Sequence, residues 1–213
     1  MILLAELCED EIVDVNPLRD IKKKKVTKRI REVLNDEERK QVNQHLLADH
    51  RYFHRFLHIF FHSGCRISEL MKVREQDVDM ANQRFKITIQ KDKEYREVWK
   101  VIKDIALPFW KQVIDECNKA DYLFTRGLKP GKTPIKSYQI GKRWYRHVKK
   151  KLNITADFYS IKHLHTTEVV DFLSDIEAAR HNDHKGTRMV NTVSDVKRKD
   201  RTTRTIKTLN NPF

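Results

Sequence analysis

The segment from Phe61 to Leu70 contains residues that could bind a phosphate group. It reads FHSGCRISEL, so Arg66 follows the small residues of a turn and stands at the start of a helical stretch that contains Glu69. A planar guanidinium can bind a carboxylate or a phosphate through two parallel hydrogen bonds. The alternative is a surface arginine that pairs with Glu69. The segment therefore indicates either an arginine that binds an anion or a structural ion pair.

Four histidines recur every four residues, at positions 50, 54, 58 and 62. At about 100° per residue, a pair such as His54 and His58 lies near one face of a helix and could chelate a metal ion. A structural zinc normally has four ligands, however, and the nearby carboxylate of Asp49 has no special placement. We therefore expect these histidines to border an apolar helix face, and we expect neither a metal nor another cofactor.

A glycine-containing loop, GLKPGKT at residues 127–133, is similar to a phosphate-binding loop. That motif needs four residues between its glycines, so that backbone N–H groups surround the phosphates. Here three residues separate Gly127 from Gly131, and Pro134 stands where a helix should begin. We therefore expect no nucleotide site in this loop.

The elements that position these residues are mostly helical. Alternation at 84–90 and 95–101, with the polar KDKE between them, predicts a β-hairpin. Asn35 and Glu38 have the spacing of a helix cap, and a later helix buries apolar residues at positions 53, 56, 57 and 60. The fold class is therefore α+β, mostly helical, with a small antiparallel hairpin or sheet. Helices are expected at 35–48, 51–62, 66–74, 107–119, 137–151, 160–173, 175–181 and near 186–193.

The stretch GCRISEL at 64–70 resembles the first conserved box of the tyrosine recombinases, the phage-type integrases, which has a Gly-x-Arg-x-Ser-Glu-Leu core. The resemblance continues in order along the chain. The hairpin, with Lys91 at its turn, resembles that family's lysine-bearing hairpin, and IALP at 105–108 resembles the family segment that comes after that hairpin. YSIKH at 159–163 stands where a His-x-x-Arg-His box is expected, and His184 falls 22 positions beyond Lys162. The resemblance implies a tyrosine-recombinase-like catalytic domain at 33–213, preceded at 1–32 by the remnant of a DNA-clamping domain and a basic linker.

The resemblance also implies roles for individual residues. Arg66 would stabilise charge on the phosphate, and Lys91 would be the general acid for the departing 5′ hydroxyl, with Lys93 as the alternative register. His184 would share proton transfer and phosphate binding. Because a phosphotyrosine link stores the energy of the broken bond, neither metal nor ATP is needed.

The chain departs from the family pattern at three positions. Tyr159 stands where the family has histidine, and Lys162 stands where it has the second arginine. The nucleophile is expected near Val193 or Ser194, and no tyrosine follows Tyr159. Ser194 would be a weak nucleophile, and Tyr159 is a second candidate.

Two interpretations stay open: a site-specific recombinase of a mobile element, or a catalytically inactive DNA-binding or regulatory protein with this fold. A basic RNA-binding domain is disfavoured because aromatic RNA-stacking motifs are lacking.

The charge of the chain favours a polyanionic partner. Lys and Arg number 44 against 30 Asp and Glu, giving a formal net charge of +14. Cations are concentrated in residues 22–31, 142–151 and 185–207, and each cation that neutralises a phosphate releases counterions. We therefore predict a double-stranded DNA partner and leave self-association on DNA open. The predicted DNA-binding residues are Lys23, Lys24, Lys25, Lys142, Arg143, Arg146 and Lys149.

The remaining composition indicates a cytoplasmic protein without membrane contact. The opening MILLAEL is too short, and too soon followed by acids, to be a secretory signal, and no apolar stretch approaches about 20 residues. Three cysteines without paired spacing argue against a disulfide framework and fit a reducing compartment.

Overall fold

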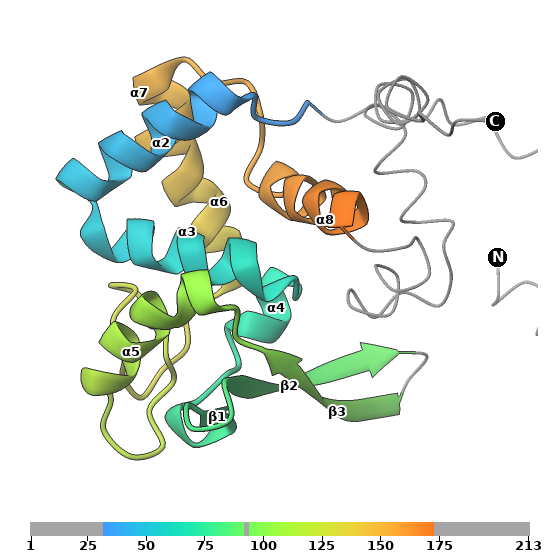
Figure 1. Cartoon of the computed structure of the whole chain (residues 1–213). Coiled ribbons are helices and arrows are strands. Elements are labelled where there is room, and N and C mark those ends of the chain that lie inside the picture. Colours follow the sequence, from blue (N-terminus) through green and yellow to red (C-terminus); the bar gives the residue numbers. More distant parts are fainter. Residues whose placement is uncertain (1–31, 92–93, 173–213) are drawn as a thin grey trace, which may run out of the picture. The chain divides into compact units, whose positions relative to one another are not determined.

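The computed structural model describes residues 32–91 and 94–172 (Figure 1). The helices and strands in chain order are α2 (Asp36–Asp49), α3 (Arg51–Ser63), α4 (Ile67–Leu70), β1 (Val78–Asp79), β2 (Arg84–Lys91), β3 (Glu94–Val101), α5 (Leu107–Asp115), α6 (Ser137–Trp144), the π-helical turn η3 (Tyr145–Lys149), α7 (Lys150–Leu152) and α8 (Ser160–Phe172). Short 3-10 turns, η1 (Glu75–Asp77) and η2 (Asp104–Ala106), precede β1 and α5. The helices predicted at 175–181 and near 186–193 lie outside the described residues.

Helix α3 is central to the described part of the chain. It contacts α2, α5 and α8, and Figure 1 shows α2 on one side of it and α5 on the other. Its apolar stripe is buried as predicted, and the rings of Phe53, Phe56 and Phe60 all contact that of Phe158, which precedes α8. Gly64 ends the helix with φ 64°, a left-handed conformation that glycine adopts without steric cost.

Helix α2 begins with the predicted capping box. The Asn35 side-chain oxygen accepts the Glu38 N–H at 2.8 Å, and a Glu38 carboxylate oxygen accepts the Asn35 N–H at 2.9 Å. These bonds satisfy backbone donors that the first turn leaves without helical partners. Helix α2 therefore starts where the sequence predicts.

The sheet has three antiparallel strands in the order β1–β2–β3. The β2–β3 hairpin confirms the predicted alternation, with Lys91 opposite Glu94 at its tip and Phe85 opposite Lys100 near its base. Strand β1 was not predicted, because a two-residue strand has too little alternation to be recognised. It adds Val78 and Asp79 against Phe85 and Arg84.

Two predicted helices are shorter than expected. The helix expected at 66–74 ends after the single turn of α4, because the chain beyond it bonds to a distant segment: Leu123 donates to the Val73 carbonyl at 3.1 Å and Glu75 donates to that of Asp121 at 2.8 Å. Helix α5 ends at Asp115 rather than 119, since Asn118 begins a turn in which its N–H donates to the Asp121 carboxylate. Tertiary hydrogen bonds thus follow the end of α4, and a local turn follows the end of α5.

The basic segment is helical from Ser137 to Leu152, close to the predicted 137–151, but contains the π-helical turn η3. Trp144, directly before that turn, is buried, and its indole N–H donates to the Ala156 carbonyl at 2.9 Å. Asn153 ends the helical run with φ 55°. Among the helices of the described residues, none is long and apolar enough to cross a membrane.

Candidate functional site

Arg66 is fixed at the start of α4 by Glu69. Its backbone N–H donates to one Glu69 oxygen at 2.6 Å, and its guanidinium donates to the other at 2.7 Å. The Glu69 carboxylate is buried, whereas the Arg66 side chain is 41% exposed. The ion pair foreseen as the alternative therefore exists, and it leaves part of the guanidinium accessible to a ligand.

Two buried lysines lie near this pair: Lys162 interacts electrostatically with Arg66 and Glu69, and Lys100 interacts with Lys162. Lys162, in the first turn of α8, is 7% exposed, and Lys100, on β3, is 5% exposed. Burial lowers the pKa of the Lys162 ammonium, Cys65 and Glu69 oppose that lowering, and Arg66 and Lys100 add to it. We call Arg66, Lys100 and Lys162 the cationic cluster. It combines three basic groups, from the N-cap of α4, from β3 and from α8, with one carboxylate, which is an arrangement that favours an anionic ligand.

Lys100 is a member of this cluster that the sequence analysis missed. It occupies the inward face of β3, on the same side as the partly buried Val98. The sequence did contain a signal for Lys100: this lysine stands at an inward position of an alternating strand, where an apolar residue is expected. Instead, we predicted Lys91, whose backbone lies at the hairpin tip, six residues along β2 from the partner of Lys100. That separation is about 20 Å along the strand.

Cys65 lies beside the cationic cluster and is fully enclosed. Its sulfur is 3.0 Å from the Ser63 hydroxyl oxygen, which itself donates to the Phe60 carbonyl. Burial raises the pKa of the Cys65 thiol to about 11, so the group stays protonated near neutral pH. A thiol is a poor nucleophile compared with a thiolate. Cys65 therefore fills space in this site rather than attacking a substrate.

Tyr159 lies directly before α8, three residues from Lys162. Its side chain is 38% exposed, and its ring packs edge-on against that of His163 at 5.1 Å between centroids. Its carbonyl accepts the Lys162 N–H at 3.1 Å. The phenol is thus accessible and is carried by the same turn that holds Lys162.

The structure brings together part of the predicted catalytic set. Arg66 and Lys162 interact, and Tyr159 adjoins Lys162. Lys91 ends β2, and its side chain is not described. The other predicted residues lie outside the described part of the chain: Lys93, His184, Ser194, Lys23, Lys24 and Lys25.

The predicted DNA-binding helix carries an exposed basic and aromatic face. Lys142 lies over the ring of Tyr138 at 5.2 Å, and Lys150 over that of Tyr145 at 5.5 Å, with both tyrosines exposed. The guanidinium of Arg143 donates to the Arg126 carbonyl. Of the two aromatics that interleave the cations in sequence, Trp144 belongs to the core and Tyr145 to the surface. A pocket of about 300 Å³ beside this face is lined by Arg126, Gln139, Lys142, Arg143, Arg146 and His147.

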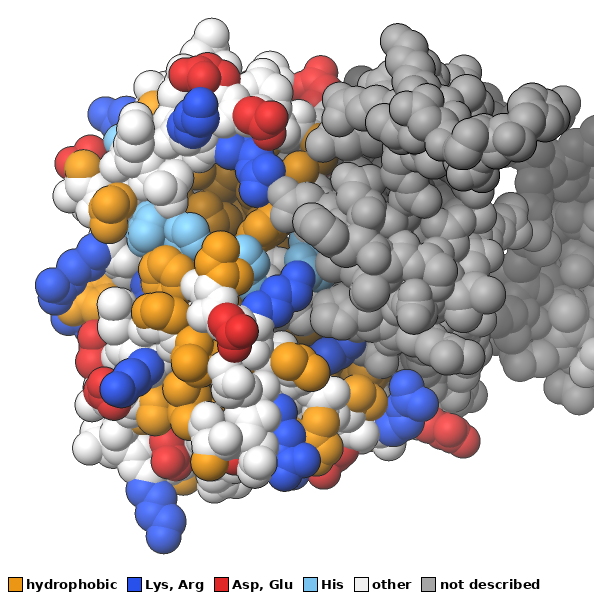
Figure 2. Space-filling view, in the orientation of Figure 1, with side chains coloured by type: hydrophobic (Ala, Val, Ile, Leu, Met, Phe, Trp, Pro, Cys, Tyr) orange, Lys and Arg blue, Asp and Glu red, His pale blue; other side chains and the backbone are white. Residues whose placement is uncertain are grey.

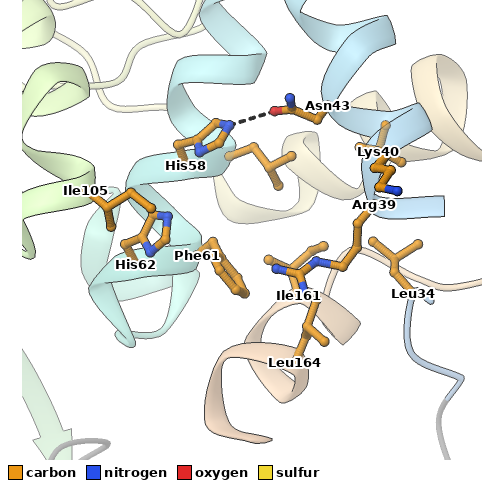
Figure 3. Close-up of a pocket in the computed structure, with 12 residues that line it drawn as sticks. Leu34, Arg39, Lys40, Asn43, His58, Phe61, His62, Ile105, Ile161 and Leu164 are labelled. Carbon is orange, nitrogen blue, oxygen red and sulfur yellow. Dashed lines mark hydrogen bonds between the residues drawn. The ribbon is translucent and has the colours of Figure 1, made fainter. Parts of the chain in front are cut away.

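The repeated histidines do more than border an apolar face. His54 is buried, and its Nε2 lies 2.8 Å from the side-chain oxygen of Asn43 in α2. Burial lowers the pKa of His58 to about 4, with His54 and His62 adding to the effect, so His58 is neutral near pH 7. His58, His62 and Asn43 line a pocket of about 320 Å³ that α2, α3 and α8 contribute to (Figure 3). Figure 2 shows histidines bordering a hollow whose wall is hydrophobic.

The GLKPGKT loop makes contacts within the protein. Leu128 is buried, Lys129 lies over the Tyr52 ring at 4.5 Å, and Lys132 pairs with Asp121 at 2.8 Å. Both lysines that could have contacted a phosphate thus have protein partners.

Comparison with known proteins gives consistent matches. The family model described as "Phage integrase family" matches residues 32–192. The "Probable integrase/recombinase" of Acholeplasma phage L2 is 26% identical over 99 residues, which is 46% of this chain and 32% of that protein. The match thus spans about a third of the phage protein's length.

Several solved structures share the fold. The XerA recombinase has a TM-score of 0.67 at 15% identity, covering 88% of this chain and 68% of that one. A lambda integrase dimer bound to a COC′ core site has a TM-score of 0.68 at 14% identity, covering 87% and 68%. The Tn1549 transposon integrase in complex with circular intermediate DNA has a TM-score of 0.70 at 16% identity, covering 95% and 74%. At these identities the likeness establishes the fold.

Proposed function

The chain belongs to the phage integrase family, the tyrosine recombinases, and from this membership we propose that it acts in the cytoplasm on double-stranded DNA as a site-specific recombinase of a mobile element. Residues 33–213 would form the catalytic domain, and residues 1–32 the end of a DNA-clamping domain with its basic linker. The observation that carries the proposal is the cationic cluster, in which Glu69 holds Arg66.

The cationic cluster suits a scissile phosphodiester for electrostatic reasons. Glu69 holds Arg66 in one orientation, so the guanidinium loses little conformational freedom when a phosphate binds. Buried Lys100 and Lys162 add positive charge in a poorly solvated place, where attraction to a non-bridging phosphate oxygen is stronger than in water. Lys162 provides a point charge in place of a bidentate fork, so the phosphate would be held less rigidly than by two arginines.

The proposed chemistry is a transesterification. A hydroxyl oxygen, from Tyr159 or Ser194, would attack the phosphorus and form a new P–O bond while the bond to the 5′ oxygen breaks. His184 would take the proton that the attacking hydroxyl loses, and Lys91, or Lys93 in the alternative register, would give a proton to the departing oxygen. Because Lys91 lies at the hairpin tip, this role requires the tip to approach the phosphate when DNA binds. One P–O ester bond forms as another breaks, so rejoining of the DNA strand is the same step in reverse.

The DNA backbone would also contact the helical face around α6. Lys142, Arg143, Arg146 and Lys149 lie on this segment, and exposed Tyr138 and Tyr145 offer flat surfaces beside them. Lys23, Lys24 and Lys25 would add contacts from the linker. Such contacts orient the duplex without reading its sequence.

A second candidate function is DNA binding without cleavage. It is favoured by one observation: the family's spacing places the nucleophile near Val193 or Ser194, and neither residue is a tyrosine. Under this alternative the cationic cluster would still bind a backbone phosphate, and the protein would act as a regulator or competitor at DNA sites.

A nicked suicide duplex that carries a true attachment site separates the two candidates. Cleavage of such a duplex releases a short fragment, which prevents rejoining and traps a covalent protein–DNA link. Recombinase activity predicts an adduct on a denaturing gel, and mass spectrometry of the peptide would identify Tyr159 or Ser194 as the linked residue. Tight binding with no adduct would instead support the non-cleaving alternative.

A further inference from the structure

Three donor atoms converge between α2 and α3. The Nε2 atoms of His54 and His58 each lie 2.8 Å from Oδ1 of Asn43, and they lie 3.1 Å from each other. The three atoms thus form a nearly equilateral triangle. Figure 3 shows Asn43 on α2 and His58 on α3 pointing toward one another at the pocket.

Hydrogen bonds within the triangle cannot use all three of its edges. A neutral imidazole carries at most one proton on Nε2, and the amide oxygen carries none. At most two edges can therefore be hydrogen bonds, and the third brings together two N–H groups or two lone pairs. If both nitrogens donate to Asn43, their N–H groups crowd side by side at 3.1 Å.

The same spacing is what a bound metal ion requires. Donor atoms about 2.1 Å from one ion lie about 3.0 Å apart when they occupy right-angle positions and about 3.4 Å apart in a tetrahedron. The observed edges of 2.8 to 3.1 Å fit the right-angle positions. With both rings neutral and protonated on Nδ1, the two Nε2 lone pairs and an oxygen lone pair are available to one ion.

We propose that His54, His58 and Asn43 form a binding site for a divalent first-row transition-metal ion, with two imidazole nitrogens and one amide oxygen as ligands. Imidazole ligands suit Zn²⁺ and Ni²⁺, and the donor spacing favours the octahedral preference of Ni²⁺. Water would fill the remaining positions from the adjoining pocket, which Asn43 and His58 line.

The sequence alone pointed away from a metal because the third ligand comes from another helix. No cluster of three His, Cys, Asp or Glu side chains suited to a metal occurs among the described residues, and the amide of Asn43 falls outside that set. His58 also has an i+4 neighbour in His62, but their ring centroids are 6.1 Å apart, against 4.4 Å for His54 and His58. His62 is thus the natural control residue.

A metal ion at this site would tie α2 to α3. Since binding to the folded state alone stabilises it, added metal should raise the unfolding temperature in a concentration-dependent way. The site has no carboxylate ligand, so we expect weaker affinity than in closed four-ligand zinc sites.

The test is isothermal titration of the tag-free full-length protein with NiCl₂ and ZnCl₂, together with thermal unfolding. We expect one site per chain, at least about tenfold weaker binding in His54→Gln and His58→Gln, and near-unchanged binding in His62→Gln. Asn43→Asp, which replaces the amide by a carboxylate of the same shape, should bind several-fold more tightly, and it guards against simple misfolding of the histidine variants.

Two results would overturn the site. One is the absence of a one-to-one metal complex in the wild-type protein. The other is equal binding by the wild type, His54→Gln and Asn43→Asp, which would assign any metal uptake to other histidines.

Discussion

Arg66 and Glu69 are joined twice, through the backbone N–H of Arg66 at 2.6 Å and through its guanidinium at 2.7 Å. The Glu69 carboxylate is buried and the Arg66 guanidinium is partly exposed, so Glu69 fixes the position of a side chain that solvent can reach. This relationship explains how a single-turn helix can hold an arginine in a fixed direction. It also explains why the glutamate of the GCRISEL segment matters even though it is negatively charged beside a proposed phosphate site.

Replacing Glu69 by glutamine should destabilise the fold. The substitution keeps the shape but weakens both hydrogen bonds and leaves a buried amide opposite Arg66. We expect the free energy of unfolding to fall by about 1–2 kcal/mol, measured by urea denaturation. The control is Glu37→Gln, which removes an exposed pair with Lys40 and should change stability by less than about 0.5 kcal/mol. Equal effects of the two substitutions would show that Glu69 is not an anchor.

Stability should fall as the solution becomes acidic between about pH 6.5 and pH 4. Burial, with nearby charges adding, lowers the pKa of both His58 and His62 from 6.5 to about 4. In that window the unfolded chain binds protons that the folded chain does not, so protonation favours unfolding. Urea denaturation at a series of pH values, with a chelator present, should show this loss. The free energy of unfolding should change less steeply with pH in His62→Gln than in the wild type. A pH-independent stability across the window would contradict these shifts.

Replacing Lys142 or Arg146 by alanine should weaken duplex binding. Log affinity falls with log salt, and each contact with a backbone phosphate contributes about 0.9 to the steepness of that fall. Each variant should therefore make the salt dependence shallower by about one unit. The matched control is Lys119→Ala, an exposed lysine just beyond α5. Fluorescence anisotropy with duplexes of two unrelated sequences should give the same loss for both. A loss confined to one sequence would instead mean that these residues read bases.

Much of the fold was predictable from local patterns. The capping residues Asn35 and Glu38, the apolar stripe of α3 and the alternation of the β2–β3 hairpin each specify their element without distant partners, and all three appear as predicted. The end of α4 was not predictable, because hydrogen bonds to the distant residues 121–123 decide it, whereas the turn from Asn118 to Asp121 beyond α5 is local and was overlooked.

The candidate site was predictable only in part for the same reason. Arg66 stood out because its neighbours form a recognisable short motif, whereas Lys100 joins it only through the pairing of β3 with β2 and the packing of α8. The convergence of Asn43 with the α3 histidines likewise depends on how α2 lies against α3. Sequence spacing shows which residues share an element, and tertiary packing decides which elements meet.

The most direct test of the cationic cluster is the salt dependence of duplex binding by Arg66→Ala. If Arg66 holds a backbone phosphate, its removal should weaken duplex binding several-fold at moderate salt. The fall of log affinity with log salt should also become shallower by about one unit. Arg84→Ala is the matched control, since Arg84 pairs with Asp79 and lies over the Trp99 ring on the sheet. An affinity and slope for Arg66→Ala equal to those of the wild type, with the protein still folded, would contradict the proposed phosphate site.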